Sequence, residues 1–239
     1  MKNIFKTILF FFSAISIAQD VGFSNILDAV YPDKNNLKFY KNYSIDSPKN
    51  TIYNINLVVK SELNSVIEVD YKSDSFNKII FSEVLDVPVE QNTGLDSRTE
   101  RFKGNVNPYV IRRAPFRIFE IIKPIKSSML ISKSNFSLIN IKIPIDKNLN
   151  LDKHQIDFTV HINDQKFSLK LKIHIHDIII PELEKSNFFY TNWFNLSKME
   201  EYHQLERWST DWYIMLDKYA KLMAYGRQNC VKIPGELIY

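Results

Sequence analysis

The sequence has little cysteine, no long hydrophobic run and little net charge, and each shortage excludes a class of protein. Cys230 is the only cysteine among 239 residues. An intrachain disulfide is therefore excluded, and the fold must be stabilised by burial alone. The apolar run at residues 8–17 is about half the roughly 20 residues that a membrane-spanning helix needs. No glycine-rich phosphate loop, nucleophile elbow or Cys/His zinc spacing is present.

The N-terminus has the three parts of a secretory signal. Lys2 and Lys6 precede the apolar run, and Ser16 and Ala18 are small residues where a signal peptidase reads the chain. We predict a signal peptide at residues 1–18, with export to the periplasm, the cell surface or the medium, as expected of a bacterial protein without disulfides. No integral membrane segment is expected after cleavage. Loss of the two lysines lowers the formal charge from +4 to +2, too little to suggest nucleic-acid binding.

An apolar period of two dominates residues 20–180. Three segments alternate in this way, namely 51–59, 156–162 and 167–175. Residues 163–166 separate the last two segments and predict a β-hairpin turn. Strands with one polar face favour an antiparallel β-sandwich, which we assign to residues 19–182.

The pattern changes after Pro181. Residues 188–194 predict a strand, and Ser197 with Glu200 matches a capping box at the start of a helix. Ser209 predicts the N-cap of a second helix, whose apolar stripe runs from Trp212 to Met223, and Gly226 predicts a left-handed stop. Residues 230–233 then predict another strand. Strand, helix, strand is the opening of an α/β arrangement, so residues 183–239 are interpreted as its incomplete first β-α-β portion in a mostly β protein.

Histidines on the last strand of the predicted sandwich could bind a metal. His174 and His176 share one strand face, and His161 lies on the polar face of the neighbouring strand. Lys170 and Lys172 lie on the same face as the first pair and would oppose a divalent cation. We therefore favour an ordinary solvated face, with no metal and no cofactor.

All three tryptophans lie between residues 193 and 212. Trp212 and Tyr219 are on the helical stripe and are interpreted as core, whereas Trp208 is assigned to neither role. Trp193 follows Asn192 at the end of a predicted strand, and Tyr202 and His203 come soon after. A ring beside amide and imidazole groups suits either a sugar-binding site or a packed core.

Glu236 follows the last predicted strand, where the carboxyl ends of barrel strands carry functional groups. It is therefore a further candidate for contact with substrate, although a loop glutamate without a role is the simpler interpretation.

Three segments together resemble the glycoside hydrolase family 123-like proteins, whose catalytic region is the domain DUF4091. They are residues 87–94 (VPVEQNTG), residues 107–124 (NPYVIRRAPFRIFEIIKP), and Thr191–Phe194 with the following Tyr202–His203 and the helix at 208–226. The resemblance implies an N-terminal β-sandwich followed by a (β/α)8 barrel. It also implies β-N-acetylgalactosaminidase activity, in which the substrate's acetamido group is the nucleophile, Asp orients it and an adjacent Glu is the acid/base.

The chain departs from that family in one respect that matters for catalysis. No Asp-Glu dipeptide follows Thr191, and only some 55 residues follow Pro181, whereas a barrel takes about 250. No catalytic residue is therefore assigned. Asn192, Trp193, Tyr202, His203 and Glu236 are the predicted substrate contacts, for a glycan containing N-acetylhexosamine. The alternative is a non-catalytic exported sandwich that binds glycan or protein.

Overall fold

The computed structural model describes residues 19–33, 37–90, 110–185, 188–191 and 194–230. The chain divides into two compact units, Met1–Ile178 and Ile179–Tyr239. The predicted signal peptide at residues 1–18 lies outside the described residues.

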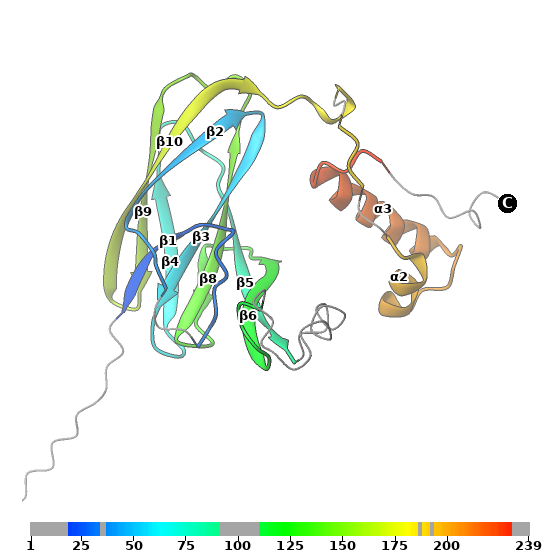
Figure 1. Ribbon diagram of the computed structural model, residues 1–239, viewed down its shortest axis with the longest axis horizontal. Helices are drawn as coiled ribbons and strands as arrows, with labels where there is room; N and C mark the ends of the chain where they lie inside the picture. The colour runs from blue at the N-terminus through cyan, green and yellow to red at the C-terminus, as the bar shows by residue number, and fades with distance from the viewer. Residues whose placement is uncertain (1–18, 34–36, 91–109, 186–187, 192–193, 231–239) are drawn as a thin grey trace, which may run out of the picture. The chain divides into compact units, whose positions relative to one another are not determined.

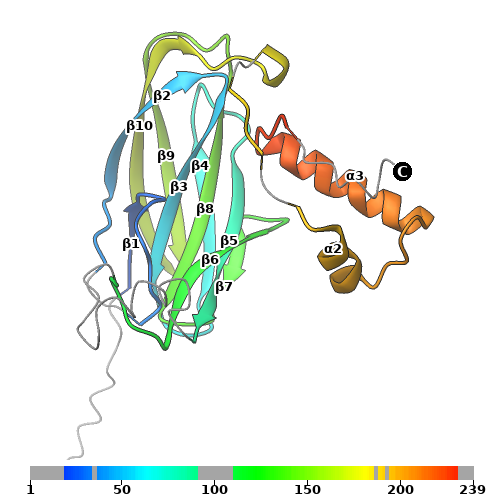
Figure 2. The same ribbon diagram turned by 45° about the vertical axis from the view of Figure 1, so that its right-hand side comes forward.

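The first unit consists of two five-stranded sheets, with the strand orders β1-β3-β8-β5-β6 and β2-β10-β9-β4-β7 (Figures 1 and 2). Every strand pairing with a described register is antiparallel. The strands are β1 (Asp20–Ser24), β2 (Asn42–Lys49), β3 (Thr51–Lys60), β4 (Val66–Lys72), β5 (Ile80–Val89), β6 (Phe116–Pro124), β7 (Met129–Ile131), β8 (Phe136–Ile145), β9 (Lys153–Ile162) and β10 (Gln165–Ile179).

The core lies between the two sheets because alternate side chains of each strand turn inward. On β9 and β10 these are the apolar residues of the predicted pattern, so Phe158 and Leu171 are almost fully buried. Lys172, which follows Leu171 on β10 and faces the other way, is exposed. Residues from both sheets form one cluster, in which the ring of Phe23 on β1 meets that of Phe158 at 5.5 Å between centroids. The predicted antiparallel, two-layered arrangement is confirmed by this packing.

The predicted turn at residues 163–166 is shorter than expected. β9 ends at Ile162 and β10 begins at Gln165, so two residues connect the strands. Asn163 takes the left-handed conformation at φ 51°, which asparagine tolerates. Its backbone N–H and its side-chain oxygen then bond Val66 at the start of β4, both at 2.9 Å. The turn therefore also fixes the neighbouring strand.

The outer face of the first sheet is partly covered, which alternation alone did not predict. Val58, Leu138 and Val84 lie opposite one another on β3, β8 and β5 and are buried. They form a second apolar cluster with Val30 and Phe136, against which Leu37 and Phe39 pack. The chain that precedes β2 therefore covers this face of the sheet.

Arg112 joins that covering segment to the start of β6. Its guanidinium group lies 4.6 Å from the centroid of the Tyr31 ring and 5.0 Å from that of Phe116. It also donates to the Asp33 carboxylate, and this ion pair raises the pKa of Arg112. A cation beside two rings and a carboxylate gives Arg112, within the 107–124 motif, a structural role in the sandwich.

The second unit contains a short 3₁₀ helix (Leu183–Lys185) and the helices α2 (Leu196–His203) and α3 (Thr210–Tyr225). α2 and α3 pack through the buried side chains of Leu196, Met199 and Trp212. The strand predicted at 188–194 is not formed in residues 188–191 or at Phe194. Of the strand predicted at 230–233, only Cys230 lies within the described residues. None of the helices in the described part of the chain is long and apolar enough to cross a membrane.

The predicted cap of α3 is confirmed, but the predicted capping box is wrong. Ser209 caps α3 by accepting a bond from the backbone N–H of Trp212 at 3.2 Å. The N-cap of α2 is Asn195, two residues before the predicted Ser197, and its side chain accepts from the N–H of Lys198 at 3.0 Å. Asparagine is as good an N-cap as serine, so the helix begins earlier and leaves the Glu200 carboxylate for other partners.

The predicted end of α3 is also corrected. Gly226 is the C-cap, but its φ is −76°, and the left-handed conformation falls on the following Arg227 at φ 64°. Hydrogen bonds from Gly226, Arg227 and Gln228 to the last turn close the helix there.

Candidate functional site

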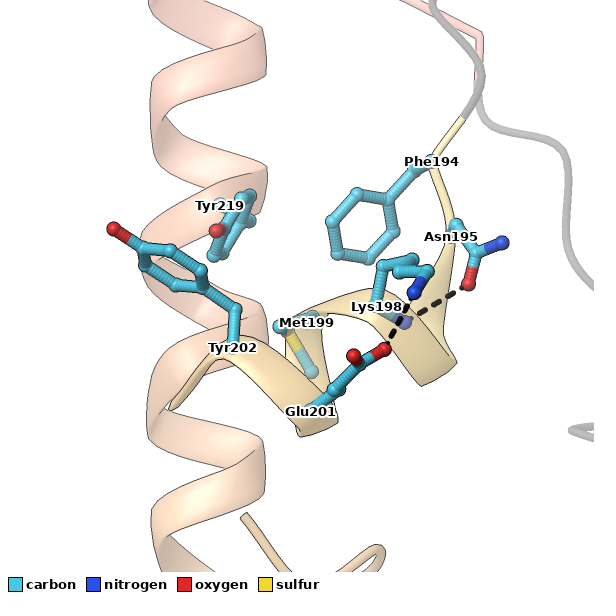
Figure 3. A pocket seen from close by; sticks show the side chains of 7 residues that line it. All are labelled: Phe194, Asn195, Lys198, Met199, Glu201, Tyr202 and Tyr219. Atoms are coloured by element: carbon cyan, nitrogen blue, oxygen red, sulfur yellow. Dashed lines mark hydrogen bonds and ion pairs between the residues drawn. The ribbon is translucent and has the colours of Figure 1, made fainter. Parts of the chain in front are cut away.

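A pocket of about 700 Å³ lies beside the two helices of the second unit (Figure 3). This volume is within the range of small-molecule sites. The described residues that line it are Phe194, Asn195, Lys198, Met199, Glu201, Tyr202 and Tyr219. The pocket thus combines three aromatic rings with amide, ammonium and carboxylate groups.

The aromatic part of the pocket is fixed by contacts between rings. The rings of Phe194 and Tyr219 are 5.1 Å apart between centroids, at an interplanar angle of 45°. His203 lies 3.0 Å from the Tyr219 hydroxyl through Nε2 and contacts the Tyr202 ring edge-on at 4.9 Å. Tyr202 is 80% exposed, so one aromatic face is open to a ligand from solvent.

The polar part of the pocket comes from α2 and its N-cap. Lys198 and Glu201 form an ion pair at 2.6 Å, and Asn195 caps the helix with its side-chain oxygen (Figure 3). Both charged side chains are exposed, so they can exchange their mutual contact for hydroxyl groups of a ligand. Among the described residues that line the pocket, Glu201 is the one carboxylate, whereas glycoside hydrolysis by side chains alone needs two.

A partly buried hydrogen-bond network holds α2 against α3. Glu200 accepts from Arg207 at 2.7 and 3.1 Å and from the indole Nε1–H of Trp212 at 2.8 Å. The hydrogen bond from Arg207 is the largest cause that lowers the pKa of Glu200, and the bond from Trp212 lowers it further. The Glu200 carboxylate therefore remains ionised and connects the two helices.

The structure places two of the three tryptophans, Trp208 and Trp212, in or against the core of the second unit. Trp212 is 1% exposed and belongs to the core of the second unit, as predicted. Trp208 is 50% exposed and lies against Trp212 at 5.1 Å between centroids, so it covers the core from outside. Trp193 lies outside the described residues.

Of the predicted substrate contacts, the structure brings Tyr202 and His203 together beside the pocket. Asn192, Trp193 and Glu236 lie outside the described residues, so their roles stay predictions, as does sugar contact by Tyr202 and His203. The predicted substrate contacts did not include the other described lining residues, which are Phe194, Asn195, Lys198, Met199, Glu201 and Tyr219. Tyr219 was assigned to the core by its helical spacing, and its partly exposed ring shows that a stripe residue can also line a pocket.

The segments on either side of the helices lie next to each other. The backbone carbonyl of Tyr190 accepts from the N–H groups of Asn229 and Cys230 at 3.1 and 3.2 Å. The Asn229 side chain accepts from the Tyr190 N–H at 2.8 Å and donates to the Phe188 carbonyl at 2.8 Å. Residues 188–190 and 229–230 are therefore neighbours.

Solved structures of other proteins match the fold of this chain to different degrees. A solved structure of a family 123 glycoside hydrolase from Clostridium perfringens matches with a TM-score of 0.62 at 11% identity, covering 80% of this chain and 33% of that one. The PapD-like domain 7 of human CEP192 matches with a TM-score of 0.29 at 5% identity, covering 74% and 98%. The CooA pilin subunit of enterotoxigenic Escherichia coli also has a TM-score of 0.29, at 11% identity, covering 67% and 99%.

No family model and no curated protein matches the sequence. The comparison with the glycoside hydrolase therefore concerns the fold alone, since the identity is low. The chain spans one third of the length of that enzyme.

Proposed function

We propose that this chain is the N-terminal part of an exported glycoside hydrolase of the family 123 type, and that the complete enzyme acts on glycans containing N-acetylhexosamine. In this proposal the two-sheet unit is the N-terminal sandwich, and residues 183–239 begin the catalytic barrel. The observation that carries the proposal is the likeness in fold to the clostridial enzyme over 80% of the chain. The three family-like segments in the sequence support it independently.

The contacts of Tyr190 with Asn229 and Cys230 also support a barrel origin for the second unit. In a (β/α)8 barrel, each helix connects two neighbouring parallel strands. The helices α2 and α3 connect two segments whose backbones are hydrogen bonded, as we would expect of a first β-α-β portion.

The proposed chemistry is substrate-assisted hydrolysis, with the Asp-Glu pair supplied from outside residues 191–239. The described pocket would contribute to sugar binding, because an open aromatic face covers the apolar side of a sugar ring and polar groups bind its hydroxyls. We expect this chain alone to leave 4-nitrophenyl N-acetyl-β-galactosaminide intact. Reading the coding DNA beyond codon 239 tests the proposal: a frame that continues for about 250 codons with an Asp-Glu pair supports it, and a stop codon there refutes it.

Sugar binding can be tested on the chain itself by saturation-transfer difference NMR with N-acetylgalactosamine. Loss of one stacking ring in Tyr202→Ala is expected to weaken binding about two- to tenfold. Tyr225→Ala is the matched control, because Tyr225 is also an exposed tyrosine of the second unit but does not line the pocket. Equal effects of the two variants, or no transfer to the sugar in the unaltered protein, would contradict a binding role for this pocket.

A further inference from the structure

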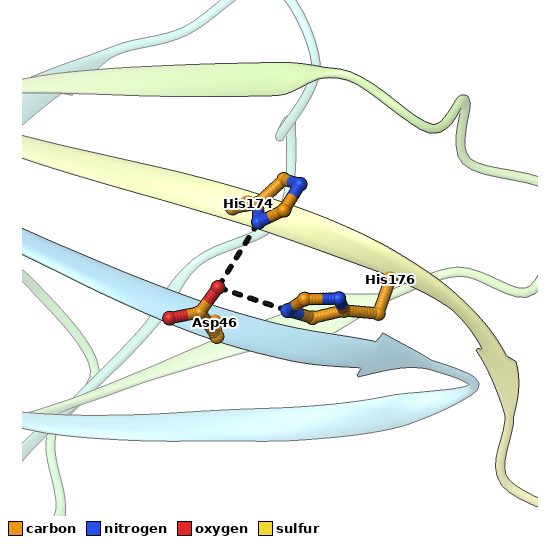
Figure 4. A group of neighbouring side chains, drawn as sticks. All are labelled: Asp46, His174 and His176. Atoms are coloured by element: carbon orange, nitrogen blue, oxygen red, sulfur yellow. Dashed lines mark hydrogen bonds and ion pairs between the residues drawn. The ribbon is translucent and has the colours of Figure 1, made fainter.

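Two histidines and an aspartate converge on the outer face of the second sheet (Figure 4). Asp46 Oδ1 lies 3.0 Å from His174 Nδ1 and 2.9 Å from His176 Nε2. The candidate ligand atoms of the three side chains all lie within 4.8 Å of one another. Asp46 belongs to β2 and the histidines to β10, which is the neighbouring strand.

The alternation of both strands creates this cluster. Ile173 and Ile175 are buried, so His174 and His176 both project outward from β10. Ile45 and Ser47 are buried on β2, so Asp46 projects from the same face of the sheet. The three side chains thus come from rigid strand backbone and need no loop to bring them together.

The spacing is close to that of a metal site with two imidazoles and one carboxylate. Zinc binds nitrogen and oxygen ligands at about 2.0–2.2 Å, so neighbouring ligands of a tetrahedral site are about 3.4 Å apart. Separating each imidazole from the carboxylate by a few tenths of an ångström, with the two imidazole nitrogens at the same spacing from each other, would admit the ion. All three groups are exposed, which leaves the remaining coordination positions to water.

We propose that Asp46, His174 and His176 form a binding site for a divalent late transition metal such as Zn²⁺. Imidazole nitrogens suit zinc, copper and nickel, and the carboxylate supplies a negative charge. The ion would connect β2, at the edge of its sheet, to β10. This proposal is independent of the glycan site in the second unit.

The structure changes which side chains can act as ligands beside His174 and His176, and therefore changes the argument against a metal that the sequence alone suggested. The sequence-based interpretation considered His161 as the third ligand, but His161 pairs with Lys166 in the register, whereas His174 pairs with Lys153. Eight residues of strand separate these two positions on β9, or about 26 Å. Asp46 takes the place of the third ligand, and its charge offsets part of the repulsion from Lys172 and Lys153.

Calorimetric titration of the whole chain with ZnCl₂, after treatment with a chelator, tests the site. We expect saturable binding of one ion per chain. His174→Ala and Asp46→Asn should each weaken binding more than about tenfold, since even loss of a group that only orients a ligand costs 10–100-fold. His161→Ala is the matched control and should bind as the unaltered protein does, because His161 is also a partly exposed histidine beside an aspartate, Asp70, at 4.0 Å.

Thermal unfolding gives a second readout that surface adsorption would not produce. At 100 times its dissociation constant, Zn²⁺ should raise the unfolding midpoint of the sandwich by about 5–10 °C in the unaltered protein and in His161→Ala. The shift should be lost in Asp46→Asn. Absence of saturable binding, or an equal loss of affinity in His161→Ala, would overturn the proposal and leave Asp46 as an ordinary ion-pair partner of the two histidines.

Discussion

Replacing Trp212 by alanine is expected to unfold the second unit and leave the sandwich intact. Trp212 is 1% exposed and is the largest side chain in the cluster that joins α2 to α3. Truncation of a buried tryptophan costs about 3–5 kcal/mol. A unit of 61 residues, Ile179–Tyr239, has a total stability of about 3–9 kcal/mol at typical values per residue. The loss is therefore comparable with the whole stability of the unit.

Amide hydrogen exchange of the full chain, followed by mass spectrometry, separates the two units. In Trp212→Ala we expect peptides from α2 and α3 to lose most of their protection, because each 1.4 kcal/mol raises the exchange rate about tenfold. Peptides from β3 and β8 should exchange as in the unaltered protein, since they belong to the other unit.

Trp208→Ala is the control of matched chemistry. Trp208 is 50% exposed, so about half as much area is lost from contact and the expected cost is about 1.5–2.5 kcal/mol. The reasoning would be refuted if α3 kept its protection in Trp212→Ala, or if the two variants lost protection equally.

Two further predictions concern packing and charge. Leu171→Ala should destabilise the sandwich by about 2–5 kcal/mol in chemical denaturation, because Leu171 is fully buried. Lys172→Ala, one position along the strand and exposed, should change stability by no more than about 0.5 kcal/mol, and equal effects would contradict the assigned faces. For Glu200, Arg207 holds the pKa below its ordinary value of 4.5, so the stabilisation is present above that pH and is lost as the pH falls through the lowered pKa. Exchange protection of α2 should therefore fall below about pH 4.5, and Glu200→Gln should remove this acid dependence, whereas Glu201→Gln should keep it.

Much of the sandwich could be predicted because strand alternation is a local property. A side chain at every second position faces the same way, so the apolar residues of 156–162 and 167–175 mark the inner face without knowledge of partners. The Ser209 cap was predictable for the same reason, since its acceptor and the Trp212 N–H are three residues apart. Burial of Val58 on the outer face was not, because it depends on where the preceding chain crosses the sheet.

The candidate sites were only partly predictable, because their members are distant in the sequence. Nothing local connects Asp46 to His174, which are 128 residues apart and meet through the pairing of β2 with β10. The spacing of Glu200 from Ser197 predicted a capping box. In the structure Glu200 instead accepts from the charged Arg207 and from the buried indole of Trp212, which are stronger partners than a solvated backbone N–H.

The sequence by itself determined the strand faces of the sandwich, the start of α3 and the core role of Trp212, since periodicity and capping act within a few residues. The tertiary structure alone decided which strands are neighbours, that Arg112 lies against the rings of Tyr31 and Phe116, and that Asp46 meets two histidines. Those contacts follow from sheet order and chain crossing, which are settled by packing across the whole unit rather than by any single segment.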